Sequence, residues 1–392
     1  MKSWKEITLG DDYIVTNAKT LNKDYPFSEI FYLDTGSITK GKVDNYQKIA
    51  LKNAPSRAKR LLSNNDIIYS SVRPANRHYG FFSNPIHNLV VSTGFIVITC
   101  NEKKLCPLFL YYYLAQEQIV EELHSIAEGS TSAYPSLLPT DIESMVISIP
   151  PTIHEQRAIA AVLSSLDDKI ELLHRQNATL ESMAEALFRK WFVVEAKEVW
   201  KEFAINEIAY QIKKSISPQN HPHKNFYYYS IPAYDLNKNP EIVCGKSILS
   251  NKFIVENNCI LISKLNPQFP RIWYIMEEVQ ENSVSSTEFI SVKPYDQQEL
   301  PFIYCLLKNH DVSSELAKSA SGTSGSHQRI KPEDIFSVTF SAPSRQYLTK
   351  FSNQVLPIYR RIQINNAQIN TLEKLRDTLL PKLMSGEIRV DF

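Results

Sequence analysis

The longest pattern of apolar positions in this chain consists of two seams of about forty residues each. In both, apolar residues recur at alternating spacings of three and four, which is the heptad pattern of paired helices. The seams comprise Leu163, Leu166, Ile170, Leu173, Asn177, Leu180 and Leu187, and then Leu348, Phe351, Val355, Ile358, Ile362, Ile369 and Leu372. Neither helix can bury so long a stripe alone, so we expect the two to pack together. Because a whole lobe separates them in sequence, the pair is predicted to be antiparallel.

The chain before each seam shows shorter patterns in a repeated order. Two β-branched, apolar runs predict buried strands, a segment with helical spacing follows, and a polar turn leads to a last strand that ends at proline. In the first half these are strands at 67–72 and 95–100, a helix from Pro107 to about Ala127, and a strand at 141–149. In the second half they are strands at 259–265 and 289–292, a helix at 301–319, and a strand that ends at Pro343.

This repeated order reflects a duplication of the sequence itself. WKEI at Trp4 returns as WKEF at Trp200, STGFIVI at Ser92 returns as STEFISV at Ser286, and PTDI at Pro139 returns as PEDI at Pro332. A repeat this long indicates two similar globular lobes rather than a solenoid. We predict an α+β fold of two similar β-rich lobes joined by two long antiparallel coiled-coil helices. The expected boundaries are 1–150 and 197–342 for the lobes, and 151–196 and 343–392 for the helices.

The composition lacks the sequence motifs of several functional classes, which restricts the possible functions. Ten glycines, with no GxGxxG or GxxxxGK[ST] motif, argue against a bound nucleotide cofactor, and we expect none. Five scattered cysteines without a CxxC pair indicate reduced thiols rather than a metal or disulfide framework. No apolar run suits a membrane span, so we expect a cytoplasmic protein without membrane contact. With a net charge of +1, a nucleic-acid-binding chain must gather its basic groups on one face.

Two loops in each lobe carry side chains that match the edges of DNA bases. Arginine and lysine pair with guanine, asparagine and glutamine pair with adenine, and small hydroxyl residues allow close approach to phosphates. The loop after the first buried strand supplies Arg73, Asn76, Arg77 and His78, and its counterpart supplies Lys264, Asn266, Gln268 and Arg271. The polar turn supplies Ser130, Thr131, Ser132 and Tyr134, and in the second half Thr323, Ser324, His327, Gln328 and Arg329. Ordinary polar surface loops are the alternative interpretation.

Catalytic and metal-binding motifs are not evident. NPQF at Asn266 is similar to the NPPF-type tetrapeptide of adenine methylases, but it lacks the second proline and the accompanying glycine-rich loop. The nine histidines form no HExxH motif, and we expect no metal site. We therefore predict a chain that performs no catalysis of its own.

The stretch PPTIHEQRAIAAVLSSLDDKIELLHRQNATLESMAEALFRKWF, from Pro150 to Phe192, resembles the central repeat of the specificity subunits of type I restriction–modification systems. The C-terminal copy keeps the LxxxLLPKLMSGEI-type ending but has Arg345 and Gln346 in place of Glu155 and Gln156. The resemblance implies a DNA-binding subunit in antiviral defence and DNA methylation. Each lobe would be a target-recognition domain that reads half of a bipartite target in double-stranded DNA. The helices would set the spacing and dock two methylase subunits, and restriction subunits would complete a methyltransferase and endonuclease.

Two other functions stay open at this point. A stand-alone adenine methyltransferase with its own recognition domain would bind S-adenosylmethionine. A protein–protein scaffold would use the lobes to bind partners other than DNA.

Overall fold

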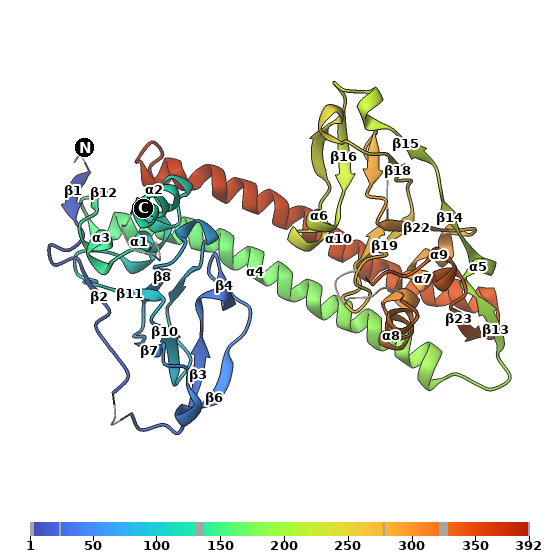
Figure 1. Cartoon of the computed structure of the whole chain (residues 1–392), viewed down its shortest axis with the longest axis horizontal. Helices are drawn as coiled ribbons and strands as arrows, with labels where there is room; N and C mark the ends of the chain where they lie inside the picture. Colours follow the sequence, from blue (N-terminus) through green and yellow to red (C-terminus); the bar gives the residue numbers. More distant parts are fainter. Residues whose placement is uncertain (1–3, 23–24, 130–135, 277–278, 321–327, 391–392) are drawn as a thin grey trace. The chain divides into compact units, whose positions relative to one another are not determined.

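The computed structural model of the chain describes residues 4–22, 25–129, 136–276, 279–320 and 328–390. It divides into two compact units, one of Met1–Leu172 with Ile369–Phe392 and the other of Leu173–Gln368. Each unit contains one β-rich lobe and part of both long helices (Figure 1). Among the described residues, no helix is both long and apolar enough to cross a membrane.

The first lobe is built around strands that are buried on both faces. Ile67 and Tyr69 of the central strand share a core with Phe109 on the neighbouring helix, whereas Ile68 faces a second sheet that includes Val91. This two-sided burial explains the unbroken apolar run in the sequence. The central sheet has the order β2-β11-β8-β9, formed by β2 (Ile14–Thr16), β11 (Phe95–Cys100), β8 (Asp66–Ser70) and β9 (Tyr79–Phe82).

The remaining elements of the first lobe cover this sheet on its two faces. On one face lies the sheet β6-β3-β10-β7, with β6 (Gln47–Ala50), β3 (Glu29–Leu33), β10 (Leu89–Ser92) and β7 (Ala58–Leu61). On the other lie α1 (Pro107–Leu114) and α2 (Glu117–Gly129). Two-stranded ribbons are formed by β1 (Lys5–Thr8) with β12 (Val146–Ile149) and by β4 (Ile38–Thr39) with β5 (Lys42–Val43), and α3 (Pro139–Glu143) precedes β12.

The second lobe repeats this topology, except that its second sheet has one more strand and, among the described residues, no ribbon corresponds to β4–β5. Its central sheet is β14-β22-β19-β20, with β14 (Ala209–Ile212), β22 (Phe289–Pro294), β19 (Cys259–Ser263) and β20 (Ile272–Ile275). The second sheet is β15-β18-β21-β16-β17, with β15 (Ser215–Ile216), β18 (Lys252–Ile254), β21 (Ser283–Ser285), β16 (Asn225–Tyr229) and β17 (Glu241–Cys244). The ribbon pairs β13 (Lys201–Ala204) with β23 (Thr339–Ala342). The short helices are α5 (Ile205–Ile208), α6 (Ile231–Leu236), α7 (Leu300–Lys308), α8 (His310–Ser319) and α9 (Pro332–Phe336).

Two helices far longer than the others carry the apolar seams. They are α4 (Ile153–Arg189, 37 residues), which continues into a π-helical turn at Lys190–Val194, and α10 (Arg345–Met384, 40 residues). All predicted seam positions are buried or half-buried. Leu163, Leu173, Leu348, Phe351 and Val355 are fully buried.

The pairing of α4 with α10 is antiparallel within each unit. In the first unit, Leu163 shares a core with Leu383, and farther along α4 the carboxylate of Asp167 accepts a hydrogen bond from Arg376 at 2.9 Å. In the second unit, the Asn365 amide donates to Asn177 Oδ1 at 2.8 Å, and the Phe188 and Phe351 rings lie 5.9 Å apart. The predicted fold, with duplicated lobes and an antiparallel pair of long helices, is confirmed.

Three local predictions were wrong. The helix expected from Pro107 to about Ala127 ends at Leu114 and restarts at Glu117. The one expected at 301–319 is interrupted at Asn309, whose side chain accepts hydrogen bonds from the backbone of Asp311 and Val312 and so starts α8. The first half of the strand expected at 141–149 is instead α3, because Asp141 accepts the Leu138 backbone N–H at 2.7 Å and favours a helical turn.

Candidate nucleic-acid interface

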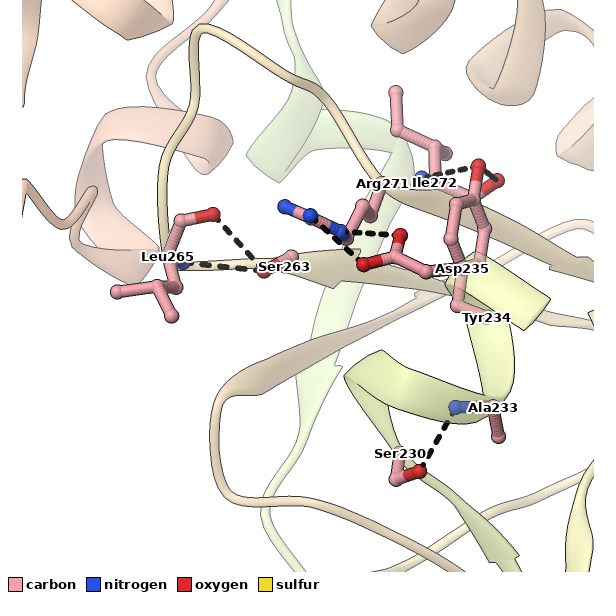
Figure 2. Close-up of polar contacts among 8 residues, drawn as sticks. All are labelled: Ser230, Ala233, Tyr234, Asp235, Ser263, Leu265, Arg271 and Ile272. Atoms are coloured by element: carbon pink, nitrogen blue, oxygen red, sulfur yellow. Dashed lines mark hydrogen bonds and ion pairs between the residues drawn. The ribbon is translucent and has the colours of Figure 1, made fainter. Parts of the chain in front are cut away.

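The first predicted loop of each lobe begins with the same backbone turn. After β8 and β19, Arg73 and Asn266 adopt positive φ angles of 48° and 51°, and each precedes a buried proline. The hydroxyl of Ser70 donates to Val72 O at 2.8 Å, and that of Ser263 donates to Leu265 O at 3.2 Å (Figure 2). The chain therefore leaves the central strand in the same direction in both lobes.

This turn is joined to the last residues of the second predicted loop. In the first lobe, Val72 forms a β-bridge with Ser136, and Leu137 N donates to Ser71 O at 2.8 Å. In the second lobe the bridge links Leu265 to Arg329. There the backbone N–H of Asn266 donates to Gln328 O at 3.1 Å. Segments 64 residues apart in sequence thus meet in each lobe, and we call this place the edge of the lobe.

Seven predicted contact residues lie outside the part of the chain that the structure describes. They are Ser130, Thr131, Ser132, Tyr134, Thr323, Ser324 and His327.

In the first lobe, the described candidates form a short exposed turn. Arg73 and Asn76 are exposed, whereas Arg77 and His78 are half-buried. Arg77 has a positive φ of 57°, and its guanidinium forms an ion pair with Glu117 at the start of α2. The Nδ1 atom of His78 lies 2.6 Å from Ile38 O and 3.4 Å from the Thr39 hydroxyl.

In the second lobe, the candidates are more firmly held by neighbouring groups. Lys264 donates to Thr287 O at 2.7 Å, and Arg329 donates to both carboxylate oxygens of Glu288, at 3.1 and 3.3 Å. Gln268 is exposed, and Asn266 and Gln328 are half-buried. Sequence reasoning missed Phe269, whose side chain is 70% exposed in the same loop. The sequence feature that could have identified it is an aromatic residue between two prolines of the loop.

Arg271 makes a two-point contact with a carboxylate that is shorter than the one made by Arg329. Its Nε and Nη2 atoms donate to the two carboxylate oxygens of Asp235 at 2.6 and 2.8 Å (Figure 2). These hydrogen bonds raise the pKa of Arg271, so the guanidinium stays charged. Asp235 was not predicted from the sequence, because it lies 36 residues from Arg271 and no local pattern distinguishes it.

Two loops of mixed basic and amide side chains at one edge provide the donors and acceptors that base edges require. Among the described residues, no group of three or more His, Cys, Asp or Glu side chains is arranged to hold a metal ion.

Comparison with known proteins identifies the family. The model of the type I restriction modification DNA specificity domain matches residues 1–182. The specificity subunit of the type I restriction enzyme MjaIX of Methanocaldococcus jannaschii is 30% identical over 315 aligned positions, covering 72% of this chain and 69% of that protein. The HindI specificity subunit of Haemophilus influenzae is 24% identical over 466 positions, covering 99% of this chain and all of that protein.

The fold itself has a solved relative. The crystal structure of the S subunit of a type I restriction–modification system from M. genitalium matches with a TM-score of 0.60 at 18% identity, covering 99% of this chain and 96% of that one. Sequence, fold and the duplicated lobes therefore agree, and the resemblance read from the central repeat is confirmed. The chain belongs to the family of type I restriction–modification specificity subunits.

Proposed function

We propose that this chain is the DNA-recognition subunit of a type I restriction–modification complex and performs no catalysis itself. Residues 1–150 and 197–342 are the target-recognition domains, and each reads one half of a bipartite target in double-stranded DNA. The observation that carries the proposal is the duplicated edge, where the loop after β8 or β19 is bridged to the segment ending the second loop. That bridge gathers donors and acceptors from two distant segments, as base reading in the major groove requires.

Ion pairing suits this edge to specific rather than general DNA binding. Arg77, Arg271 and Arg329 each have a carboxylate partner within their own lobe. When a carboxylate pairs with a guanidinium, it offsets the positive charge, so the pair adds little to the attraction for phosphates. The carboxylate also holds the guanidinium in a fixed orientation. We therefore expect weak affinity for random DNA and a shallow dependence of that affinity on salt.

The long helices are proposed to dock two methylase subunits, with restriction subunits completing the nuclease. Apolar side chains on the outer surface of both helices support this role. In the first unit Leu172 and Leu375 are 39% and 44% exposed, and in the second unit Met183 and Ile364 are each 50% exposed. Among the described residues, each unit thus offers one exposed large apolar side chain from each helix, a repeated feature that suits two copies of one partner.

The helices are also proposed to fix the gap between the two half-sites. Stiff paired helices would hold the two lobes at one separation and one rotation about the DNA. Because B-DNA presents its groove once per about 10.5 base pairs, only one gap between the half-sites would fit. A flexible linker would tolerate many gaps, with affinity falling slowly as the gap changed.

Methylation mapping tests the function directly. Genomic DNA from cells that carry the methylase partner is sequenced for modified bases, with and without this chain. We expect a bipartite methylated motif that disappears when the chain is absent. A motif that persists without the chain would overturn the proposal.

Two further assays separate this function from its rivals. Equilibrium dialysis of the purified chain with S-adenosylmethionine is expected to give no binding, whereas a stand-alone methyltransferase would bind. A mobility shift with random duplexes, with and without the methylase, distinguishes DNA recognition from a scaffold that binds only proteins.

A further inference from the structure

Two residues occupy corresponding positions at the reading edges of the two lobes. The backbone N–H of Ser70 donates to His78 O at 2.9 Å, and that of Ser263 donates to Arg271 O at 2.9 Å. Both residues immediately precede the strand that pairs with the central strand, β9 or β20. His78 and Arg271 are therefore structural equivalents.

The groups that hold these two side chains also correspond. The chain after β3 brings Ile38 O to 2.6 Å and the Thr39 hydroxyl to 3.4 Å from His78 Nδ1. The chain after β16, the counterpart of β3, brings Asp235 to Arg271. The duplicated scaffold thus presents a Thr39–His78 pair in one lobe and an Asp235–Arg271 pair in the other. If the two lobes recognise different half-sites, we expect positions at which the backbone is the same in both lobes and the side chain differs.

The helix that carries Asp235 is fixed at several points. Ser230 caps α6 by accepting the Ala233 N–H at 3.1 Å. The Tyr234 hydroxyl accepts the Ile272 N–H at 3.3 Å and lies 3.4 Å from Ile272 O, which joins α6 to the edge of β20 (Figure 2). Because Asp235 follows Tyr234 directly, these hydrogen bonds help to place its carboxylate beside Arg271.

The pairing geometry determines which guanidinium atoms stay available. Asp235 takes Nε and one N–H of Nη2, so Nη1 and the second N–H of Nη2 remain. These two groups form the end-on fork that matches O6 and N7 of guanine. Within the described residues, the buried Nη1 atom has no hydrogen-bond partner. A buried donor without a hydrogen bond costs free energy.

We propose that Asp235 is a positioning residue that aims Arg271 at a guanine of the second half-site. The inference rests on the proposed function, because it assigns one base contact within that recognition. Because Nη1 is buried, contact with the base requires the groups that cover this atom to move aside. The base then supplies the acceptor that Nη1 lacks.

The test measures base discrimination by the full-length chain bound to its methylase partner, using selection from a duplex library. Arg271→Ala is expected to lower discrimination at one G·C pair of one half-site by about 5- to 140-fold, the value of one bidentate base contact. Asp235→Asn keeps the shape of the side chain but weakens the fork. It is expected to lower discrimination at the same base pair, leaving the other half-site and thermal unfolding unchanged.

A matched control exists in the same lobe. Glu256 pairs with Lys293, and the exposed fractions of these side chains, 36% and 20%, are close to the 47% and 19% of Asp235 and Arg271. Glu256 lies before β19, at the end of that strand remote from Ser263 and Arg271. Glu256→Gln should therefore leave discrimination unchanged at every position.

Base analogues identify the contacted atoms. Replacing the implicated guanine by 7-deazaguanine, which lacks N7, should weaken binding of the unmodified chain about fivefold or more and should not affect Arg271→Ala. Inosine, which keeps O6 and N7, should bind as guanine does. If Asp235→Asn lowers discrimination at both half-sites equally, or leaves it intact, the inference is overturned while the proposed function stands. If no sequence is selected even by the unmodified complex, the proposed function itself fails.

Discussion

The two lobes share one scaffold but attach it to the long helices through different chemistry. In the first unit, the buried Gln156 side chain near the start of α4 accepts the Cys106 N–H at 2.8 Å, just before α1 begins. In the second unit, Arg345 at the start of α10 donates to both oxygens of the buried Glu299, at 2.7 and 2.5 Å, just before α7. An amide and an ion pair thus secure the same junction, which shows that the joint is preserved while its residues are not.

The packing beside these junctions differs as well. In the first unit the long helix contributes the aliphatic side chains of Ile159 and Leu163 to a core with Phe109, whose ring lies 6.2 Å from that of Trp4. In the second unit the long helices contribute aromatic rings of their own, since the Phe351 ring lies 5.1 Å from Phe192 and 5.9 Å from Phe188. The two units have therefore diverged in their cores as well as at the edges that we propose to read DNA.

The largest expected effect comes from this aromatic cluster. Phe351→Ala should lower the free energy of unfolding by about 3–5 kcal/mol, because the side chain is fully buried and its removal leaves a cavity. Ile159→Ala, at the matching place in the first unit, should cost about 2–5 kcal/mol. Chemical denaturation measures both. Losses below about 1 kcal/mol for either change would contradict the proposed packing.

Gln156→Ala tests the amide junction. It leaves the Cys106 N–H without its acceptor and should lower the free energy of unfolding by about 1–3 kcal/mol. The control is Gln346→Ala, which removes a glutamine at an exposed position near the start of α10 and should stay within about 0.5 kcal/mol. Equal effects in thermal unfolding would show that the two junctions do not differ in the way described.

Arg77→Ala and Arg271→Ala test the division between the reading edges. Each should reduce discrimination between bases by about 1–3 kcal/mol, and each in a different half-site. Selection of bound sequences from a duplex library gives the readout. An even loss across both halves from either change would make that arginine a phosphate contact or a structural residue.

The smallest effect is expected from the asparagines of the seam. Asn365 is fully buried and donates to Asn177, and a polar pair in such a seam fixes register at a cost in stability. Changing Asn177 and Asn365 together to leucine should alter the free energy of unfolding by about 1 kcal/mol or less. The altered chain should accept a wider range of gaps between half-sites. A loss of several kcal/mol would instead show that the pair holds the helices together.

The sequence predicts those parts of the molecule that depend on local or repeated patterns. The seams, the buried strands and the duplication are all readable, because burial on one or two faces imposes a period on residue type. The break at Asn309 had a readable cap, but the continuous apolar spacing concealed it. Loop residues such as Arg271 could be singled out by type, whereas their partners could not. Asp235, Glu117 and Glu288 reach them through tertiary contacts that leave no periodic trace.

The central claim, that two lobes read a bipartite target at a gap set by the helices, is tested most directly by lengthening both helices. One heptad inserted after Ser165 in α4 and one after Thr378 in α10 keeps the seam in phase, since Asp167 lies opposite Arg376. The insertion extends the pair by roughly 10 Å, close to three base-pair rises. Selection from a library of half-sites at every gap should recover the same two half-sites at one new gap. Recovery of the original gap, or of a broad range of gaps, would contradict the account.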